Sequence, residues 1–512
     1  MEYVIEMNHI TKIFGNFKAL DDVTLKVRKG EVHALLGENG AGKSTLMSVL
    51  FGLYQAEKGE IIINGKPEQI NNPNDANNLN IGMVHQHFKL VHNFTVLESI
   101  ILGRETVKMG VLKKEDARKK VMDLSERYKL KIDPDAYISD ITVGMQQRVE
   151  ILKMLYLDSD ILIFDEPTAV LTPQEIEELM KIMKELVSEG KSIIFISHKL
   201  NEIKEAADRC TILRKGKWIG TVDVSTTTKE QMSEMMVGRK INFNIEKKDI
   251  KTGEAVFEVK NLTIKSKNSK KNVVNDVSFE VRKGEIVCIA GIDGNGQSEL
   301  VYGITGLMPI NEGKIILNGK DITKESIRKK CIDGMAHIPE DRHKHGLILD
   351  FDLQQNAVLQ TYYEPRFHKS GFIKFNTVRE YAKKLIKQYD IRSPRDEDSI
   401  VRNMSGGNQQ KLIIARELDR NPEIVLAVQP TRGLDVGATE YIHKQLVAQR
   451  DEGKAVLLIS LELDEVMNVS DRILVIYEGE IVGDLNPKEI TVKELGLYMA
   501  GSKRGAKYGK KA

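Results

Sequence analysis

Residues able to bind and cleave a phosphoanhydride stand at two places in the first half of the chain. The first is residues 37–44, Gly-Glu-Asn-Gly-Ala-Gly-Lys-Ser, which match the pattern G-x-x-x-x-G-K-[ST] in full. Glycines at this spacing let backbone N–H groups surround a phosphate at the start of a helix, and the lysine adds a positive charge. The residues expected to bind the nucleotide here are Gly37, Glu38, Asn39, Gly40, Ala41, Gly42, Lys43, Ser44 and Thr45.

The second place is an acidic pair, Asp165 and Glu166, directly after the apolar run 161–164. That run predicts a buried strand, so both carboxylates stand at its carboxyl end, where ligands bind in parallel sheets. Asp165 is placed to hold Mg²⁺ together with the Ser44 hydroxyl, and Glu166 is placed to polarise an attacking water. The two places together predict phosphoryl chemistry on a nucleotide.

These residues need alternating strands and helices to bring them together. Period-two apolar residues in 23–27 predict a strand, and the glycine-rich turn is followed by a helix that starts near Gly42. Further along, the pattern predicts helices over 113–129 and 174–189, and a strand over 192–196. This alternation is typical of an α/β fold with a largely parallel sheet.

The chain contains this plan twice. Residues 20–66 and 274–320 share the string Val-Arg-Lys-Gly-Glu, a glycine-rich turn and a late Asn-Gly-Lys, and 141–155 is similar to 404–418. Such self-similarity indicates a tandem duplication. The expected organisation is domain 1 over 1–240, a polar linker over 241–254, domain 2 over 255–502 and a basic tail over 503–512.

Composition narrows the classes of function. The 512 residues carry 76 Lys and Arg against 74 Asp and Glu, and this net charge of +2 gives no support to nucleic-acid binding. Apolar runs such as 455–461 fall far short of the roughly 20 residues that a membrane span needs. We therefore expect a cytoplasmic protein that reaches a membrane only through partners.

Taken in order, the motifs resemble those of ATP-binding-cassette (ABC) ATPases over nearly the whole chain. Residues 141–148, Ile-Thr-Val-Gly-Met-Gln-Gln-Arg, are similar to the family's signature LSGGQ-Q-R, with departures at three positions. Gln86 lies 43 residues after Lys43, where the family has its Q-loop glutamine. His198 resembles the family's switch histidine, and Phe14 stands where the family places an aromatic ring against adenine.

The resemblance implies an α/β fold of two tandem P-loop ABC ATPase domains. Each would have a largely parallel sheet core, an antiparallel β subdomain and a helical signature subdomain. The implied catalytic residues are Glu166, His198 and Gln86, and the implied Mg²⁺ ligands are Ser44, Gln86 and Asp165. ATP and Mg²⁺ are the cofactors that this resemblance implies.

The second copy differs from the first at the positions that are expected to bind and cleave the nucleotide. Gln297 replaces the phosphate-binding lysine, Val428 and Gln429 replace the acidic pair, and Leu461 replaces the switch histidine. Glu340, again 43 residues after Gln297, stands at the Q-loop position. A neutral amide supplies no positive charge, so efficient hydrolysis is not expected there, although backbone amides still allow ATP to bind. The degenerate site comprises Gly291, Gly294, Gly296, Gln297, Ser298, Glu340 and Gln429.

The signature, by contrast, is intact in the second copy, where residues 404–410 are Met-Ser-Gly-Gly-Asn-Gln-Gln. In the resembling family two cassettes pair head-to-tail, and each ATP lies between the phosphate loop of one and the signature of the other. The resemblance therefore implies that the two copies pair with each other. Residues 142–145, the altered signature, would face the degenerate loop. The signature residues that would complete the competent ATP site are Ser405, Gly406, Gly407 and Gln409.

Two classes of function compete for this ATPase. One is the motor subunit of a membrane importer whose permeases are separate chains, and the other is a soluble ABC translation factor that acts on ribosomes. Translation factors of the family carry two intact sites and a long charged helical linker. The degraded second site and the short linker therefore favour the importer.

Within importers, residues 83–90, 291–298, 339–346 and 429–436 are similar to the nucleoside branch of the monosaccharide and nucleoside importer group. This similarity implies two membrane permease subunits and an extracytoplasmic substrate-binding lipoprotein as partners. It also implies a peripheral position at the cytoplasmic face of the cell membrane. A ribose-type sugar is the alternative substrate. Residues 87–102 and 341–359 are expected to receive the permeases.

Overall fold

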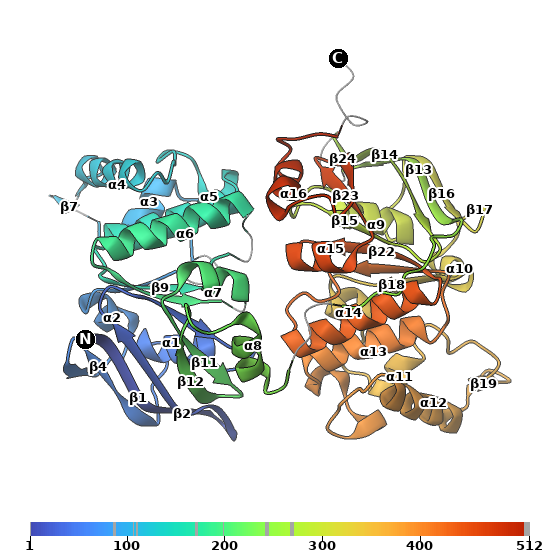
Figure 1. Ribbon diagram of the computed structural model, residues 1–512, viewed down its shortest axis with the longest axis horizontal. Helices are drawn as coiled ribbons and strands as arrows, with labels where there is room; N and C mark the ends of the chain where they lie inside the picture. The colour runs from blue at the N-terminus through green and yellow to red at the C-terminus, as the bar shows by residue number, and fades with distance from the viewer. Residues whose placement is uncertain are drawn as a thin grey trace, which may run out of the picture. The chain divides into compact units, whose positions relative to one another are not determined.

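The structure is a computed structural model that describes residues 2–84, 89–105, 107–108, 111–168, 171, 173–197, 199–240, 245–266 and 271–505. The chain divides into two compact units, Met1–Ile241 and Asn242–Ala512 (Figure 1). Of the residues expected to act in the site, Gln86 and His198 lie outside the described residues.

Unit 1 alternates strands and helices in the following order. Its elements are β1 (Tyr3–Phe14), β2 (Phe17–Arg28), β3 (Val32–Leu36), α1 (Lys43–Leu50), β4 (Lys58–Ile63), β5 (Lys66–Glu68), α2 (Pro73–Asn78), β6 (Ile81–Val84), α3 (Val96–Ile101), β7 (Val107–Lys108), β8 (Val111–Leu112), α4 (Glu115–Arg127), η1 (Ile138–Asp140), α5 (Val143–Tyr156), β9 (Ile161–Asp165), α6 (Pro173–Ser188), β10 (Ser192–Ile196), α7 (Leu200–Ala206), β11 (Arg209–Arg214), β12 (Lys217–Asp223) and α8 (Lys229–Val237).

Unit 2 repeats this order with small changes. Its elements are β13 (Ala255–Lys265), β14 (Asn272–Arg282), β15 (Ile286–Ala290), α9 (Gln297–Thr305), β16 (Glu312–Leu317), β17 (Lys320–Asp321), α10 (Ile327–Ile332), β18 (Met335–Ile338), η2 (Arg342–Gly346), α11 (Leu353–Ala357), β19 (His368–Lys369), β20 (Phe372–Ile373), α12 (Phe375–Gln388), η3 (Asp396–Asp398), η4 (Val401–Asn403), α13 (Gly406–Leu418), β21 (Ile424–Val428), α14 (Val436–Asp451), β22 (Ala455–Ser460), α15 (Leu463–Val469), β23 (Arg472–Tyr477), β24 (Glu480–Leu485) and α16 (Val492–Met499).

A six-stranded sheet forms the centre of each unit. In unit 1 the strand order is β12-β11-β3-β10-β9-β6, and in unit 2 it is β18-β21-β22-β15-β23-β24. All pairs are parallel except the edge hairpins β11–β12 and β23–β24. Every residue of β3, β9 and β10 is buried, as expected for parallel strands that are covered on both faces.

Each unit also has a four-stranded antiparallel sheet, β2-β1-β4-β5 in unit 1 and β14-β13-β16-β17 in unit 2. Helices α3, α4 and α5 gather at the end of unit 1 away from β1 and β2, and α11, α12 and α13 gather at the end of unit 2 away from β13 and β14 (Figure 1). The expected combination of a parallel core, an antiparallel β subdomain and a helical subdomain is therefore confirmed in both units.

The strand β15 shows how a buried parallel strand serves two cores. Ile286, Cys288 and Ala290 pack into one apolar cluster together with residues of α12, α13 and α14. Val287 and Ile289 pack into a second cluster with residues of the antiparallel sheet. Successive side chains of a strand point to opposite faces, so one apolar run fixes both layers and the glycine-rich turn that follows it.

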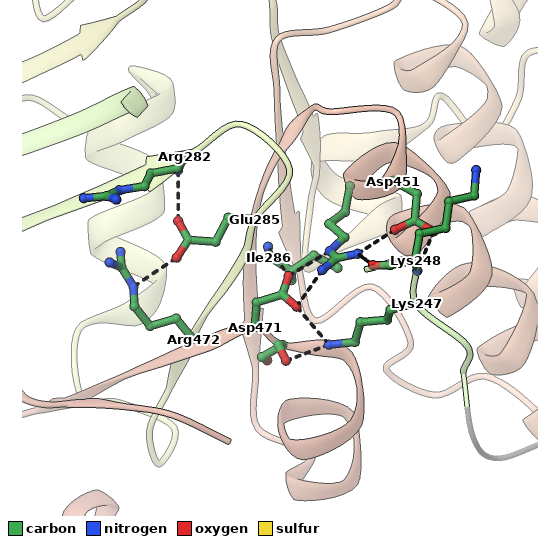
Figure 2. A network of polar contacts seen from close by, with 10 residues as sticks. Lys247, Lys248, Arg282, Glu285, Ile286, Asp451, Asp471 and Arg472 are labelled. Carbon is green, nitrogen blue, oxygen red and sulfur yellow. Dashed lines mark hydrogen bonds and ion pairs between the residues drawn. The ribbon is translucent and has the colours of Figure 1, made fainter. Parts of the chain in front are cut away.

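Residues 245–254, within the segment expected to link the copies, belong to unit 2. Figure 2 shows Lys247 and Lys248 beside Asp471 and Asp451. The ammonium of Lys247 lies 3.3 Å from a carboxylate oxygen of Asp471, and the guanidinium of Arg450 donates to the other oxygen at 3.1 Å. That second oxygen also accepts the backbone N–H of Ile286 at 2.9 Å. One carboxylate therefore ties this segment to α14 and to the start of β15.

Among the helices of the described residues, none is both long enough and apolar enough to cross a membrane.

Candidate nucleotide sites

The phosphate loop of unit 1 joins β3 to α1 and has the backbone shape that its glycines predict. Gly40 and Gly42 have φ values of +78° and +99°, in the left-handed region. A Cβ at Gly42 would approach the Leu20 side chain at 2.7 Å, so no larger residue fits. The loop and the first turn of α1 bring together all of Gly37, Glu38, Asn39, Gly40, Ala41, Gly42, Lys43, Ser44 and Thr45.

The side chain of Lys43 is buried and folded back over this loop. Its ammonium donates to the carbonyl oxygens of Gly37 at 2.7 Å and Glu38 at 3.1 Å. Burial lowers the pKa of Lys43, and the charges of Glu166, Asp165 and Glu38 oppose that shift. The positive charge therefore lies within electrostatic reach of the acidic pair, as the sequence pattern predicts.

The acidic pair stands at the end of β9. Asp165 is the last residue of the strand, and Glu166 follows in a left-handed conformation with φ +48°. The N–H of Glu166 donates to the carbonyl of Ile196, at the end of the neighbouring strand β10, at 3.1 Å. A non-glycine residue in this conformation is strained, and such strain is concentrated at functional sites.

Asp165 shows why this strand end suits a cation. Burial and then the charge of Glu166 raise the pKa of Asp165 to about 6, although a hydrogen bond from Ser44 and the charge of Lys43 lower it. Its buried Oδ1 has no hydrogen-bond partner within the part of the chain that the structure describes. A cation at this oxygen would satisfy it and restore the charged form of the carboxyl group.

The donors at this site fit Mg²⁺ in particular. In the described residues, no three or more His, Cys, Asp or Glu side chains gather so that they could hold a metal ion. Mg²⁺ is usually held by one or two carboxylates together with phosphate oxygens and waters, rather than by a cage of protein ligands. Asp165 and the exposed Ser44 hydroxyl, beside the phosphate loop, are a donor set of that kind.

A buried glutamate that the sequence pattern did not reveal fixes the segments around this strand end. Glu202 accepts hydrogen bonds of 2.8 Å from the hydroxyl groups of Ser197 and Thr168. It therefore joins the residues that follow β9 to those that follow β10. The two remaining predicted residues of the site, Gln86 and His198, lie outside the described residues.

The expected adenine platform, Phe14, is the last residue of β1 and is 42% exposed. Tyr54 packs edge-on against its ring with 5.1 Å between the ring centroids, and the ammonium of Lys12 lies 5.3 Å from its centroid. The ring is thus held from the protein side while much of it faces solvent. This is the arrangement that a stacking surface for a flat base requires.

The phosphate loop of unit 2 keeps the backbone of unit 1 but not its charge. Gly294 and Gly296 have φ values of +87° and +99°, and a Cβ at Gly291 would approach a backbone carbonyl at 2.8 Å. The amide of Gln297 donates to the carbonyl of Ile292 at 3.0 Å. Gln297 therefore forms the same kind of bond to its loop as Lys43 does, as a neutral group.

The strand end of unit 2 also keeps its backbone. Gln429 has φ +43°, and its N–H donates to the carbonyl of Ile459 at 2.7 Å, as that of Glu166 does to Ile196. The preceding residue, Val428, is buried and offers no oxygen from its side chain. The local strain is present in both copies, whereas the carboxylates are present only in the first.

In unit 2 the only carboxylate carried by these predicted positions is that of Glu340, and the chain's own groups already bind it. Ser298 donates to one of its oxygens at 3.1 Å, and Gln429 donates to the other at 2.9 Å. The guanidinium of Arg432 lies 2.5 Å from that second oxygen. With valine at position 428 and Glu340 bound in this way, the residues of this site do not fit Mg²⁺.

Both signature segments begin a helix, but their surroundings differ. Ser405 caps α13 and is exposed, and Thr142 caps α5 with a 3.3 Å bond from the Met145 N–H. A Cβ at Gly144 would meet the carboxyl carbon of Glu175 at 3.0 Å, which places a negative charge against the altered signature.

The intact signature has both a cation and a carboxylate beside its glycines. A Cβ at Gly406 would lie 3.3 Å from the Arg342 guanidinium, and one at Gly407 would lie 3.8 Å from a carboxylate oxygen of Asp435. At Gly407, the residue equivalent to Gly144, a Cβ would meet the methyl group of Ala438 at 3.1 Å. The amide of Gln409 donates to the carbonyl of Val401 at 2.9 Å, which holds the start of α13 against η4. Of the two signatures, this one keeps the serine and both glycines and has an arginine against it, which favours an anion.

Both copies are similar to a known family of proteins. Residues 20–169 and 274–432 each match the family described as ABC transporter. The chain belongs to the ABC transporter family. The guanosine import ATP-binding protein NupO of Bacillus subtilis (strain 168) is 56% identical over 502 residues, 98% of each chain. The nucleoside import ATP-binding protein NupA of Lactococcus lactis subsp. cremoris (strain MG1363) is 55% identical over 501 residues, again 98% of each chain.

A more distant ABC relative is named for a sugar. The glucose import ATP-binding protein TsgD13 of Haloferax volcanii is 40% identical over 529 residues, which cover 98% of this chain and 96% of that one. The relatives thus match this ABC chain over nearly their whole length, including both copies.

The ABC motifs identified most of the site, but not the residues that support it. Glu175 contacts Gly144, Arg432 contacts Glu340 and Glu202 contacts Thr168, each more than twenty positions away in the chain. Glu175 and Glu202 lie in no motif, and the similarity of residues 429–436 to the nucleoside branch gives Arg432 no role. The sequence offers one signal for these supporting residues. Glu340 departs from the family pattern, which has an amide at this position.

Proposed function

We propose that this chain is the ATP-hydrolysing subunit of an ABC importer that takes up nucleosides. The observation that carries the proposal is the 56% and 55% identity, over 98% of each chain, to import ATP-binding proteins named for guanosine and for nucleosides. Relatives named for glucose and for xylose are 40% identical over comparable lengths. Sugar uptake is therefore the alternative with less support.

The first copy supplies the chemistry of hydrolysis. The loop amides and Lys43 bind the phosphates, with the Lys43 ammonium exchanging its bonds to the loop carbonyls for phosphate oxygens. Ser44 and Asp165, with Gln86, would hold Mg²⁺, and the ion would neutralise charge on the phosphate oxygens. Glu166, fixed at its strand end by the bond to Ile196, accepts the proton of the attacking water.

We propose that the second copy supplies the signature for this ATP. Ser405, Gly406 and Gly407 are intact, and the guanidinium of Arg342 lies against Gly406. The altered signature of the first copy has Val143 where the second copy has Gly406, and the Glu175 side chain lies against Gly144. One active site per chain follows, with His198 and Gln86 responding to its γ-phosphate.

The partners proposed for this chain are two membrane permease subunits and an extracytoplasmic substrate-binding lipoprotein. The permeases would hold the chain at the cytoplasmic face of the membrane by contacting residues 87–102 and 341–359. In the second of these segments Ile348 and Phe351 are each 40% exposed, as an apolar contact surface requires. We also propose 1–240 and 255–502 as the two cassettes, 241–254 as their linker and 503–512 as a basic tail.

The test is uptake of radiolabelled uridine, guanosine and ribose in the source cells. Cells that carry the wild-type chain are compared with cells that carry Glu166→Gln at matched expression. Loss of nucleoside uptake alone is the expected result. Loss of ribose uptake alone would assign the chain to sugar import, and unchanged uptake of all three would overturn the proposal.

A further inference from the structure

A continuous series of polar contacts in unit 2 runs from the phosphate loop to the signature helix. It begins at Ser298, in the first turn of α9, whose hydroxyl donates to Glu340 at 3.1 Å. Glu340 is bound on its other oxygen by the Arg432 guanidinium at 2.5 Å. These two contacts join the loop that follows β18 to the phosphate loop and to the segment that follows β21.

The series continues through Arg342, the first residue of η2. Its guanidinium donates to the backbone carbonyl of Arg432 at 2.8 Å and to that of Gly406, in the signature, at 3.1 Å. The adjacent His343 contacts the side-chain oxygen of Gln409 at 3.0 Å. The start of α13 is therefore tied to Glu340 through fixed donors of the same unit.

These contacts occupy the place where a competent site has its ligands. In the first copy the hydroxyl of Ser44 bonds to Asp165, but Oδ1 of that carboxylate has no partner among the described residues. In the second copy the equivalent hydroxyl, Ser298, is already bonded to Glu340, and an arginine supplies the positive charge. The groups that would respond to Mg²⁺ and nucleotide are thus satisfied by side chains.

We propose that Glu340, Arg432 and Arg342 form a built-in brace that positions the intact signature without any ligand in the second site. Arg342 and Arg432 are positioning residues in this proposal, because they act on ATP through Ser405–Gly407 and do not touch it. The proposal rests on the proposed function, in which that signature serves the ATP bound by the first copy. It explains why a copy that has lost its catalytic groups keeps an ordered site.

The physical basis is the difference between a fixed and a mobile hydrogen-bond donor. A signature that is held in place before ATP arrives loses no freedom when it binds the γ-phosphate, so the transition state is stabilised more. A signature that is released must be ordered in each cycle. Cutting the brace should therefore lower kcat while KM, which depends mainly on the first phosphate loop, stays nearly unchanged.

The first experiment measures amide hydrogen exchange of the nucleotide-free, full-length chain. In Arg432→Gln and in Arg342→Ala, peptides that cover 404–410 should exchange at least about tenfold faster than in wild type. Peptides that cover 142–148 of the first copy should not change. Exchange at 404–410 in wild type should also be the same with Mg²⁺ and with EDTA. Unchanged exchange in both variants, or protection that requires Mg²⁺, would overturn the brace.

The second experiment measures steady-state ATP hydrolysis by the same proteins. Arg432→Gln and Arg342→Ala should each lower kcat about five- to tenfold and change KM by less than about twofold. The double variant Glu340→Gln/Arg432→Gln should lose no more than either single variant, because both changes cut one series of contacts. Additive losses would contradict a shared brace.

Two controls separate this proposal from the function on which it rests. Arg282→Ala removes an exposed guanidinium that pairs with Glu280 at 2.6 Å, and it should alter neither exchange at 404–410 nor kcat. Ser405→Ala should lower kcat whether or not the brace exists. If Ser405→Ala has no effect, the proposed pairing of sites fails, whereas a loss in Ser405→Ala with wild-type kcat in Arg342→Ala refutes only the brace.

Discussion

The side-chain amide of Gln429 donates a hydrogen bond of 2.9 Å to the carboxylate of Glu340. These residues are the second-copy equivalents of Glu166 and Gln86, so the amide and the carboxylate have exchanged places between the copies. A carboxylate at the strand end can accept a proton from water, and an amide cannot. The exchange therefore removes the base from the strand end of the second copy.

The backbone conformation at these positions is the same in both copies, although the side chains differ. Glu166 and Gln429 both have left-handed conformations, with φ values of +48° and +43°, and both donate to the end of the next strand. The strain of about 1–3 kcal/mol that such a conformation costs is thus retained where the carboxylate is lost. This conformation connects the strand end to the segment that follows it, and the second copy retains the same connection.

Replacement of the proposed base should stop hydrolysis without preventing binding. Glu166→Gln keeps the size of the side chain and the bond from its N–H to Ile196, but it removes the proton acceptor. Turnover is expected to fall by about a hundredfold or more. Affinity for a fluorescent ATP analogue should stay within about threefold of wild type, because Lys43 and the loop are unchanged.

The matched variant in the second copy is Gln429→Ala. It removes one of the contacts to Glu340 but no base, so turnover should fall by less than about tenfold. An equal loss in Glu166→Gln and Gln429→Ala would show that the two copies contribute alike to hydrolysis.

Binding of ATP with Mg²⁺ should depend on the protonation of Asp165. Its pKa of about 6 lies above the ordinary value of 3.8, so between these values the folded, ligand-free chain holds a proton that the unfolded chain lacks. This group therefore adds stability to the ligand-free chain as pH falls through about 6, and that contribution is lost as pH rises. Mg²⁺ must displace the same proton.

Affinity for ATP in the presence of Mg²⁺ is accordingly expected to fall by up to about tenfold per pH unit below pH 6. Titration calorimetry from pH 5 to pH 8 measures this dependence. Asp165→Asn is the control, since it should bind more weakly at pH 8 and lose the part of the pH dependence that belongs to Asp165. A wild-type profile that matches that of Asp165→Asn would exclude this carboxylate as the titrating group.

The fold was predictable because its signals are local. Apolar runs such as 161–164 and 192–196 predicted the buried strands, and the glycines of the loop predicted its left-handed turns. The ends of the longer helices were less well determined. Helix α4 runs from Glu115 to Arg127, inside the predicted 113–129, because helix ends depend on capping and on packing against α5 as well as on periodicity.

The supporting contacts were not predictable, because they join residues that are distant in sequence. Arg342 reaches Gly406 and Arg432, which lie 64 and 90 positions away. Arg342 lies in residues 339–346, whose similarity to the nucleoside branch gives no role to this arginine. The altered residues of the second copy predicted a lost function, whereas the contacts that replace that function required the folded chain.

The intact signature should matter more for turnover than the altered one. Ser405→Ala removes the exposed hydroxyl that caps α13, and turnover should fall about tenfold or more if that hydroxyl also binds the γ-phosphate. Thr142→Ala removes the matching cap of α5. Because both changes cost a helix cap of about 1 kcal/mol, thermal unfolding should show similar losses in both variants. Only Ser405→Ala should lower kcat, and a similar loss in Thr142→Ala would contradict the assignment of one competent site.

Asp471 should contribute more to stability than its equivalent in the first copy. Asp208 accepts a backbone N–H from Val32 at 2.9 Å, as Asp471 does from Ile286, but Asp471 also binds Arg450 and Lys247 (Figure 2). Asp471→Ala is therefore expected to lower the free energy of unfolding by about 2–3 kcal/mol, and Asp208→Ala by about 1 kcal/mol. Both losses are measured by unfolding the protein in urea and using tryptic digestion to monitor how much of each unit is unfolded.

The same network predicts how residues 245–254 are held in unit 2. Lys247→Ala removes one partly exposed contact to Asp471, so its cost should stay below about 1 kcal/mol. It should nevertheless increase proteolysis within 245–254, because that ammonium is one of the groups that hold the segment on unit 2. Two results together would contradict this prediction: equal losses of stability in Asp471→Ala and Asp208→Ala, and unchanged proteolysis in Lys247→Ala. They would show that the contacts of residues 245–254 add nothing to the bond that each aspartate accepts from a backbone N–H.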